Sequence, residues 1–289
     1  MPIWFIEECE KLADLYSVRF LEPARRECPR LDTDVWDSLK FFLMGYAFER
    51  QGRAQDYLPI ARDAVDECRD SPLSDDSARR VWQVFLSKLG NVGPNMALNP
   101  LCPNGESYQR KWRDRTSTCS TRQPSVVQLA VDEFHGEPMV SWAGRLLKED
   151  RVEAAYDVLL RLNGVSGKIA SFFLRDVAII HEIAPAGDRH LLQPVDTWVR
   201  MVARNLSGDG TLDDTGSASY IVEDSVQPER ANQGIWYFCS QVASSSQYLV
   251  RRSMSDRAYM RGLVRHHLGS LVETGKAASS CALEWGIEI

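Results

Sequence analysis

The chain has 289 residues of ordinary globular composition and carries a formal net charge of −6. This length suits one large or two small domains with a sizeable core, and the acidic balance excludes a protein that binds nucleic acid by bulk charge. The N-terminus has no basic, apolar leader, and no apolar run is long enough to cross a bilayer. We therefore expect a cytoplasmic protein without membrane contact, associated with the nucleoid if its source is prokaryotic.

Helical patterns dominate the first third of the chain, and β signals are sparse throughout. Residues 1–20 are predicted to be helical, with a break at Pro23. Residues 32–34 then cap a strong helix whose apolar residues continue to Tyr46. Residues 54–90 supply two more helices. We expect a helical protein from this pattern.

A change of character follows in residues 91–124, where Gly, Pro, Asn and Ser dominate without a sustained period. This composition predicts a long loop or insertion. Basic residues lie around Tyr108 and Trp112 in this segment, which suits contact with a nucleic-acid backbone. A solvated charged loop fits the same residues equally well.

Two amphipathic helices joined by a tight turn form the centre of the chain. Apolar residues recur at helical spacing over 152–160 and again over 169–180. The glycines at both ends of the turn let the chain reverse without a steric cost from Cβ. The turn has four residues, Gly164, Val165, Ser166 and Gly167.

A third helix is predicted after Pro194. Asp196 is placed as its N-cap, the apolar residues that follow lie on one helical face, and Ser207 with Gly208 gives a stop signal.

The turn and this cap together resemble the helix–hairpin–helix region of the DNA glycosylase superfamily that includes endonuclease III and 8-oxoguanine glycosylase. Residues 162–170 follow L-x-G-V-x-x-K-I-A, similar to the family's L-P-G-V-G-x-K-x-A, and residues 194–199 read P-V-D-T-W-V, similar to its V-D-T-H element. The match covers about 40 residues. It departs at Ser166, where the family has glycine, at Trp198, where histidine is common, and in a longer separation of its two halves.

The resemblance implies an all-α fold of two helical lobes that flank a cleft. One lobe would span 33–192 and end in the helix–hairpin–helix of about 151–182. The other would combine 1–32 with 193–289 and carry the catalytic aspartate. Lys168 and Asp196 would then face each other across the cleft from different lobes.

The chemistry implied by the resemblance is removal of a damaged or modified base from double-stranded DNA, followed by strand cleavage. The positive end of a helix dipole disfavours the ammonium form of Lys168, and a neutral amine can attack the sugar C1′ to form a Schiff base. Asp196, stabilised as an anion by its cap position, would steady cationic charge on the sugar and assist proton transfer. Backbone N–H groups of the hairpin would hold a phosphate, with the base flipped into the cleft.

Further candidates follow from the resemblance with less support. Gln51 would fill the gap left by the flipped base, although an ordinary polar helix end is the more economical interpretation. Phe172, Gln233 and Trp236 would line the base pocket, although core packing explains the two aromatic residues as well.

No cofactor or metal is expected. Relatives of endonuclease III carry a four-cysteine iron–sulfur cluster near the C-terminus, but only Cys239 and Cys281 lie in the last third of this chain. The scattered cysteines indicate reduced thiols, and the histidines show no metal-site spacing. We expect a monomer.

Two other interpretations remain open. The chain could be a helix–hairpin–helix DNA-binding protein without chemistry, in which Lys168 only contacts phosphate, or a helical interaction protein in which the match is accidental. Basic residues near the C-terminus suit either phosphate contact or a solvated helix face; they are Arg251, Arg252, Arg257, Arg261 and Arg265.

Overall fold

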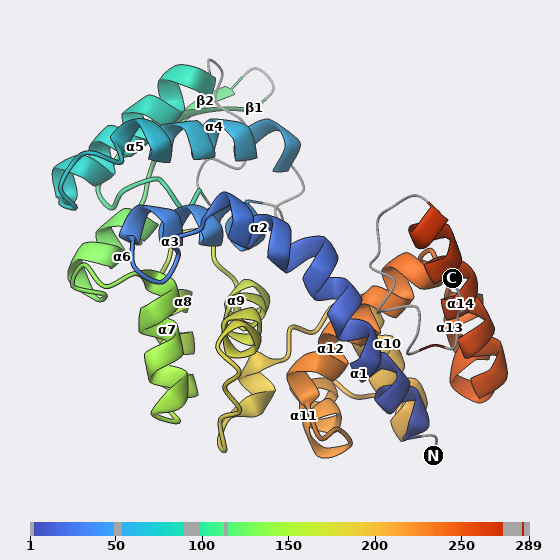
Figure 1. The fold of residues 1–289 in the computed structure, drawn as a ribbon. Helices are drawn as coiled ribbons and strands as arrows, with labels where there is room; N and C mark the ends of the chain where they lie inside the picture. The colour runs from blue at the N-terminus through green and yellow to red at the C-terminus, as the bar shows by residue number, and fades with distance from the viewer. Residues whose placement is uncertain (1–2, 49–53, 90–98, 113–114, 274–284, 286–289) are drawn as a thin grey trace. The chain divides into compact units, whose positions relative to one another are not determined.

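The computed structural model describes residues 3–48, 54–89, 99–112, 115–273 and 285 (Figure 1). The chain divides into two compact units. Unit 1 combines residues 1–23 with 188–289, and unit 2 comprises residues 24–187. The described residues are almost entirely helical, so the prediction of an all-α fold is confirmed at the level of fold class.

Unit 1 is built on the close packing of its first helix against a helix from the far end of the sequence. The helix α1 (Trp4–Tyr16) lies along α12 (Pro228–Tyr237), and Phe5 meets Phe238 edge to face at 5.6 Å between ring centroids. The other elements of unit 1 are η1 (Ser17–Leu21), η5 (Arg189–Leu192), α10 (Thr197–Ser207), α11 (Asp214–Glu223), η6 (Phe238–Val242), α13 (Gln247–Ser255) and α14 (Arg257–Glu273).

A buried carboxylate ties the last helix of unit 1 to the first. Glu8 on α1 is only 1% exposed and accepts hydrogen bonds from Arg257 at 2.6 Å and from Arg261 at 2.6 Å, both on α14. Burial opposes the charged form of Glu8, but these two guanidinium groups outweigh it, so the pKa of Glu8 is lowered. Arg265 donates to the backbone carbonyl of Trp285 at 3.0 Å. These arginines of α14 therefore connect that helix to α1 and to Trp285.

Unit 2 is a helical assembly with an aromatic core. Tyr46 and Phe173 pack edge to face at 5.4 Å, and Trp82 stacks on Phe85 at 5.7 Å. The elements of unit 2 are α3 (Val35–Phe42), η2 (Leu43–Ala47), α4 (Ala54–Cys68), α5 (Asp75–Leu89), β1 (Ser107–Trp112), β2 (Arg115–Ser120), α6 (Val126–Asp132), α7 (Met139–Lys148), α8 (Val152–Leu160) and α9 (Gly167–Ile180).

Two local predictions were wrong. The segment expected to be a loop contains a two-stranded antiparallel sheet, β1 with β2, in which Ser107 pairs with Ser120 and Trp112 with Arg115. The break expected at Pro23 does not occur, because the chain remains helical through α2 (Glu22–Glu27). Pro23 follows directly on the π-helical η1, where the Glu22 N–H bonds to the Ser17 carbonyl, and such a local change in helix spacing accommodates a proline.

Candidate functional site

The turn between α8 and α9 is formed by buried apolar residues and one left-handed glycine. The helix α8 ends at Leu160, and Gly164 has a φ of 76°, a conformation that disfavours residues with a Cβ. Leu162 is fully buried, Val165 is 9% exposed, and the Val165 N–H donates to the Leu162 carbonyl at 3.2 Å. The turn is thereby anchored to the core of unit 2.

Asn163 fixes the same turn to a distant part of the chain. This residue is 3% exposed, and its Nδ2 donates to the Asn99 carbonyl at 2.9 Å. Its backbone N–H donates to the Pro124 carbonyl at 3.2 Å. The segments on either side of the β1–β2 hairpin thus support the turn, and sequence reasoning missed this role because Asn163 looked like an ordinary helix end.

The second turn glycine is required by a neighbouring side chain. A Cβ on Gly167 would lie 2.3 Å from the hydroxyl oxygen of Tyr156 on α8. Burial raises the pKa of that hydroxyl, and a hydrogen bond with Ser171 on α9 opposes the rise. The Tyr156–Ser171 bond therefore joins the two helices beside Gly167. A residue with a Cβ at position 167 would therefore displace the Tyr156 hydroxyl.

The N-terminus of α9 is open. Ser166 occupies the N-cap with extended backbone (φ −93°, ψ 165°), is exposed, and makes no capping hydrogen bond with its side chain. The Ala170 N–H donates to the Ser166 carbonyl at 3.0 Å. No residue that the structure describes accepts from the N–H groups of Gly167, Lys168 or Ile169. Free N–H groups and the helix dipole favour an anion at such an end.

Lys168 is the second residue of α9, and its side chain is exposed. Its Nζ lies 6.0 Å from the ring centroid of Phe172, one turn further along. Phe172 is itself 1% exposed and has the guanidinium of Arg175 at 4.7 Å from its ring centroid. Phe172 is thus a buried ring of unit 2 with two cations near it, and its expected role in a base pocket stays a prediction.

A buried ionic network lies further along α9. Arg175 is fully buried and donates from Nε to Asp176 at 2.8 Å. The hydroxyl of Tyr46 donates to the other oxygen of Asp176 at 3.0 Å. The pairing compensates the cost of burying both charges. Sequence reasoning did not identify this network, because adjacent Arg and Asp residues in a helix are usually solvated.

Asp196 is the N-cap of α10, as predicted. Its Oδ1 accepts from the N–H groups of Trp198 at 2.8 Å and Val199 at 2.9 Å. The carboxylate is half-buried beside the fully buried thiol of Cys239, whose pKa is raised well above its ordinary value by burial first and by Asp196 second. Among the described residues none donates to Oδ2 of Asp196, so this oxygen is available to a ligand.

Gln233 and Trp236 both lie on α12. Gln233 is fully buried, and Trp236 is partly buried in an aromatic cluster with Tyr16 at 5.7 Å and Phe20 at 5.4 Å between ring centroids. The gap-filling candidate Gln51 falls outside the described residues. The expected site residues are therefore shared between the units: the hairpin, Lys168 and Phe172 belong to unit 2, and Asp196, Gln233 and Trp236 to unit 1.

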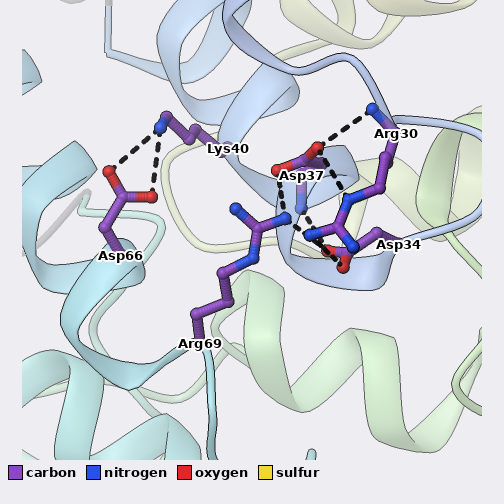
Figure 2. Close-up of polar contacts among 6 residues, drawn as sticks. All are labelled: Arg30, Asp34, Asp37, Lys40, Asp66 and Arg69. Atoms are coloured by element: carbon purple, nitrogen blue, oxygen red, sulfur yellow. Dashed lines mark hydrogen bonds and ion pairs between the residues drawn. The ribbon is translucent and has the colours of Figure 1, made fainter.

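A second charged cluster lies at the start of α3 (Figure 2). Asp37 is 2% exposed and accepts from the Arg30 N–H at 3.0 Å and from Arg69 at 2.6 Å. Burial raises the pKa of Asp34, but the Asp37 N–H and Arg69 outweigh it and the pKa is lowered. These groups satisfy one another, so the cluster ties α3 to the C-terminal end of α4, beside a further ion pair of Lys40 with Asp66 at 3.0 Å.

The described residues contain neither a cluster of metal-binding side chains nor a membrane-spanning helix. No group of three or more His, Cys, Asp and Glu residues there could hold a metal ion. None of the helices in the described ranges is long and apolar enough to cross a membrane.

Comparison with known proteins gives one relative of unknown activity. No protein-family model and no solved structure matches the chain. The chain is 43% identical over 117 residues to an uncharacterized protein, MJECL21, of Methanocaldococcus jannaschii. The match covers 40% of this chain and 24% of that protein, so the chain spans about a quarter of the relative's length.

Proposed function

We propose that the protein is a DNA glycosylase with abasic-site lyase activity, which excises a damaged or modified base through a lysine Schiff base. The observation that carries this proposal is the open N-terminus of α9, where the exposed Lys168 follows directly on a two-glycine turn. Three N–H groups without an acceptor among the described residues, beside a solvent-accessible amine, suit a nucleophile that works next to a phosphate.

The steps use groups of this chain in stated roles. The N–H groups of Gly167, Lys168 and Ile169 bind a DNA phosphate without reading sequence. The Lys168 amine attacks C1′ of the flipped nucleotide, and the base leaves with the electron pair of the glycosidic bond and takes up a proton. The C1′–O4′ bond of the sugar ring then breaks, O4′ takes up the proton that the amine releases, and a Schiff base forms between Lys168 and C1′. This Schiff base acidifies the C2′ proton, whose removal breaks the C3′–O bond and nicks the strand. Water then releases Lys168.

Asp196 would act as an anion rather than as a nucleophile. The N–H groups of Trp198 and Val199 engage its Oδ1, and its Oδ2 accepts no hydrogen bond from the described residues. In the proposed reaction this oxygen steadies positive charge on the sugar as the base departs and assists proton transfer.

The test is reductive trapping. The protein is incubated with labelled duplexes that carry an abasic site, 8-oxoguanine, an oxidised pyrimidine or uracil, and borohydride is then added. We expect a covalent protein–DNA band that disappears in Lys168→Gln. Lys148→Gln is the matched control, because Lys148 is also an exposed lysine of unit 2, at the end of α7, and the band should persist in it.

The outcome of trapping also names the substrate, because the duplex that traps most efficiently carries the preferred lesion. A band that persists in Lys168→Gln would overturn the assignment of the nucleophile. If neither a band nor base release occurs with any duplex, the enzyme proposal is wrong.

A second candidate function is DNA binding without chemistry. The exposure of Lys168 supports it, since an exposed amine beside open N–H groups is also the arrangement of a simple phosphate contact. This function requires duplex binding that weakens with salt and gives no trapped complex. Lys168→Gln would then lower the slope of log affinity against log salt by about 0.9.

A further inference from the structure

A concavity of about 370 Å³ lies in unit 1 and is formed by α10, the loop that follows it and α13. Three arginines line it, Arg200 and Arg204 from α10 and Arg251 from α13. Thr197 and Asn205 add polar side chains, and none of the described residues of the lining carries a carboxylate. The lining therefore offers several hydrogen-bond donors to an anion.

The sequence of α10 places these residues on its outer face. Thr197, Arg200 and Arg204 recur at three and then four residues, so they share one side of the helix. The opposite side carries Val199 and Val202, which are buried in the core of unit 1. The apolar face that folds the helix thus directs the arginines outward.

Two of the arginines are held by neighbours in a way that leaves donors free. Arg200 uses Nε, at 2.7 Å, and Nη2 to bind Oδ1 of Asp214, and its Nη1 has no partner among the described residues. Arg204 uses Nε to bind the Leu212 carbonyl at 2.8 Å, and no described residue accepts a hydrogen bond from its two Nη groups. Guanidinium groups fixed in this way lose less conformational entropy when they bind a ligand.

Arg251 is the arginine of the lining that has no carboxylate near it among the described residues. Asp214 pairs with Arg200, and Asp209 lies near Arg204: the bonds of Asp209 with Thr211 lower its pKa most, and Arg204 lowers it further. Arg251 is exposed and has no ion-pair or hydrogen-bond partner among the residues that the structure describes.

The other arginines near the C-terminus are engaged elsewhere. Arg252 lies over the ring of Tyr259 at 4.0 Å, whereas Arg257 and Arg261 bind Glu8. Arg251 is thus set apart from its neighbours in sequence by lining the concavity.

We infer that this concavity is a phosphate-binding pocket that takes a phosphodiester of a nucleic-acid strand. Arginine side chains match phosphate geometry, and the volume, at the small end of the range of about 300–1,000 Å³ for ligand pockets, fits a phosphate with an attached sugar. The phosphate chemistry follows from the pocket itself. The assignment of the phosphate to a nucleic-acid strand rests on the proposed function.

The experiment measures binding of a fluorescein-labelled duplex by anisotropy between about 50 and 200 mM salt. Arg251→Gln should weaken binding roughly threefold to tenfold and lower the salt slope by about 0.9. Arg252→Gln is the matched control, because it removes the same charge from the next residue, outside the pocket, and should leave affinity and slope unchanged. Equal effects of the two variants, or no duplex binding at all, would overturn the inference.

Inorganic phosphate distinguishes the pocket from a diffuse basic surface. At matched ionic strength, phosphate in place of chloride should displace the duplex from the wild-type protein more strongly than from Arg251→Gln. Equal displacement from both proteins would contradict a defined phosphate pocket.

The pocket and the proposed enzyme can fail separately. If duplex affinity depends on Arg251 but no complex is trapped through Lys168, the pocket stands and the lyase falls. If trapping occurs and Arg251→Gln binds like Arg252→Gln, the lyase stands and the pocket falls.

Discussion

The requirement for glycine at position 167 gives a quantitative test of the hairpin geometry. In Gly167→Ala the new methyl would lie 2.3 Å from the Tyr156 hydroxyl oxygen, so this hydroxyl must move and lose its bond with Ser171. The lost hydrogen bond costs about 1 kcal/mol and the overpacking about 1–3 kcal/mol, whereas replacing glycine in a helix returns up to about 1 kcal/mol. We expect the free energy of unfolding to fall by about 1–3 kcal/mol.

A double-mutant cycle measured by urea denaturation isolates the clash. Tyr156→Phe alone should cost about 1 kcal/mol, and it removes the atom that the new methyl would strike, leaving the ring carbon at 3.4 Å. Adding Gly167→Ala to it should then cost almost nothing, a coupling of at least about 1 kcal/mol. Gly45→Ala is the control, because nothing lies within 4 Å of its Cβ position. Additive effects of the two substitutions would refute the reasoning.

Two further predictions concern unit 1. A Cβ on Gly234 would lie 1.6 Å from the backbone carbonyl oxygen of Cys9, so Gly234→Ala must force α1 and α12 apart. We expect thermal denaturation to show that the free energy of unfolding falls by more than about 3 kcal/mol. An unchanged melting temperature would contradict the close approach. Burial first, and then Arg19 and His266, lower the pKa of His267 from 6.5 to about 4. The folded protein thus keeps this ring neutral while the unfolded chain protonates it, so the free energy of unfolding should fall as pH drops from 6.5 towards 4. His267→Gln should flatten this pH dependence. The same pH dependence in the variant would show that the ring of His267 is not its source.

Local chemistry determined much of the helical framework. The caps at Asp34 and Asp196 and the stop at Gly208 depend on short-range hydrogen bonds and on one left-handed glycine, so the sequence predicted them correctly. The helices α8 and α9 followed in the same way from two apolar periods separated by glycines.

The strands β1 and β2 escaped prediction for a physical reason. Their stability comes from pairing with each other, whereas their composition of polar residues next to Gly and Pro is typical of a loop. The helical path through Pro23 was missed for a similar reason, because proline stops a helix only where its N–H is required.

The sequence by itself determined the helix caps, the turn glycines and the buried helix faces, because caps, turns and amphipathic periods depend on neighbours within a few residues. It could not assign partners across long separations. The approach of Tyr156 to Gly167, the burial of Arg175, and the selection of Arg251 for a concavity with Arg200 and Arg204 were decided by tertiary packing. Packing brings distant segments together, and only the three-dimensional arrangement shows which charges are already satisfied and which remain available to a ligand.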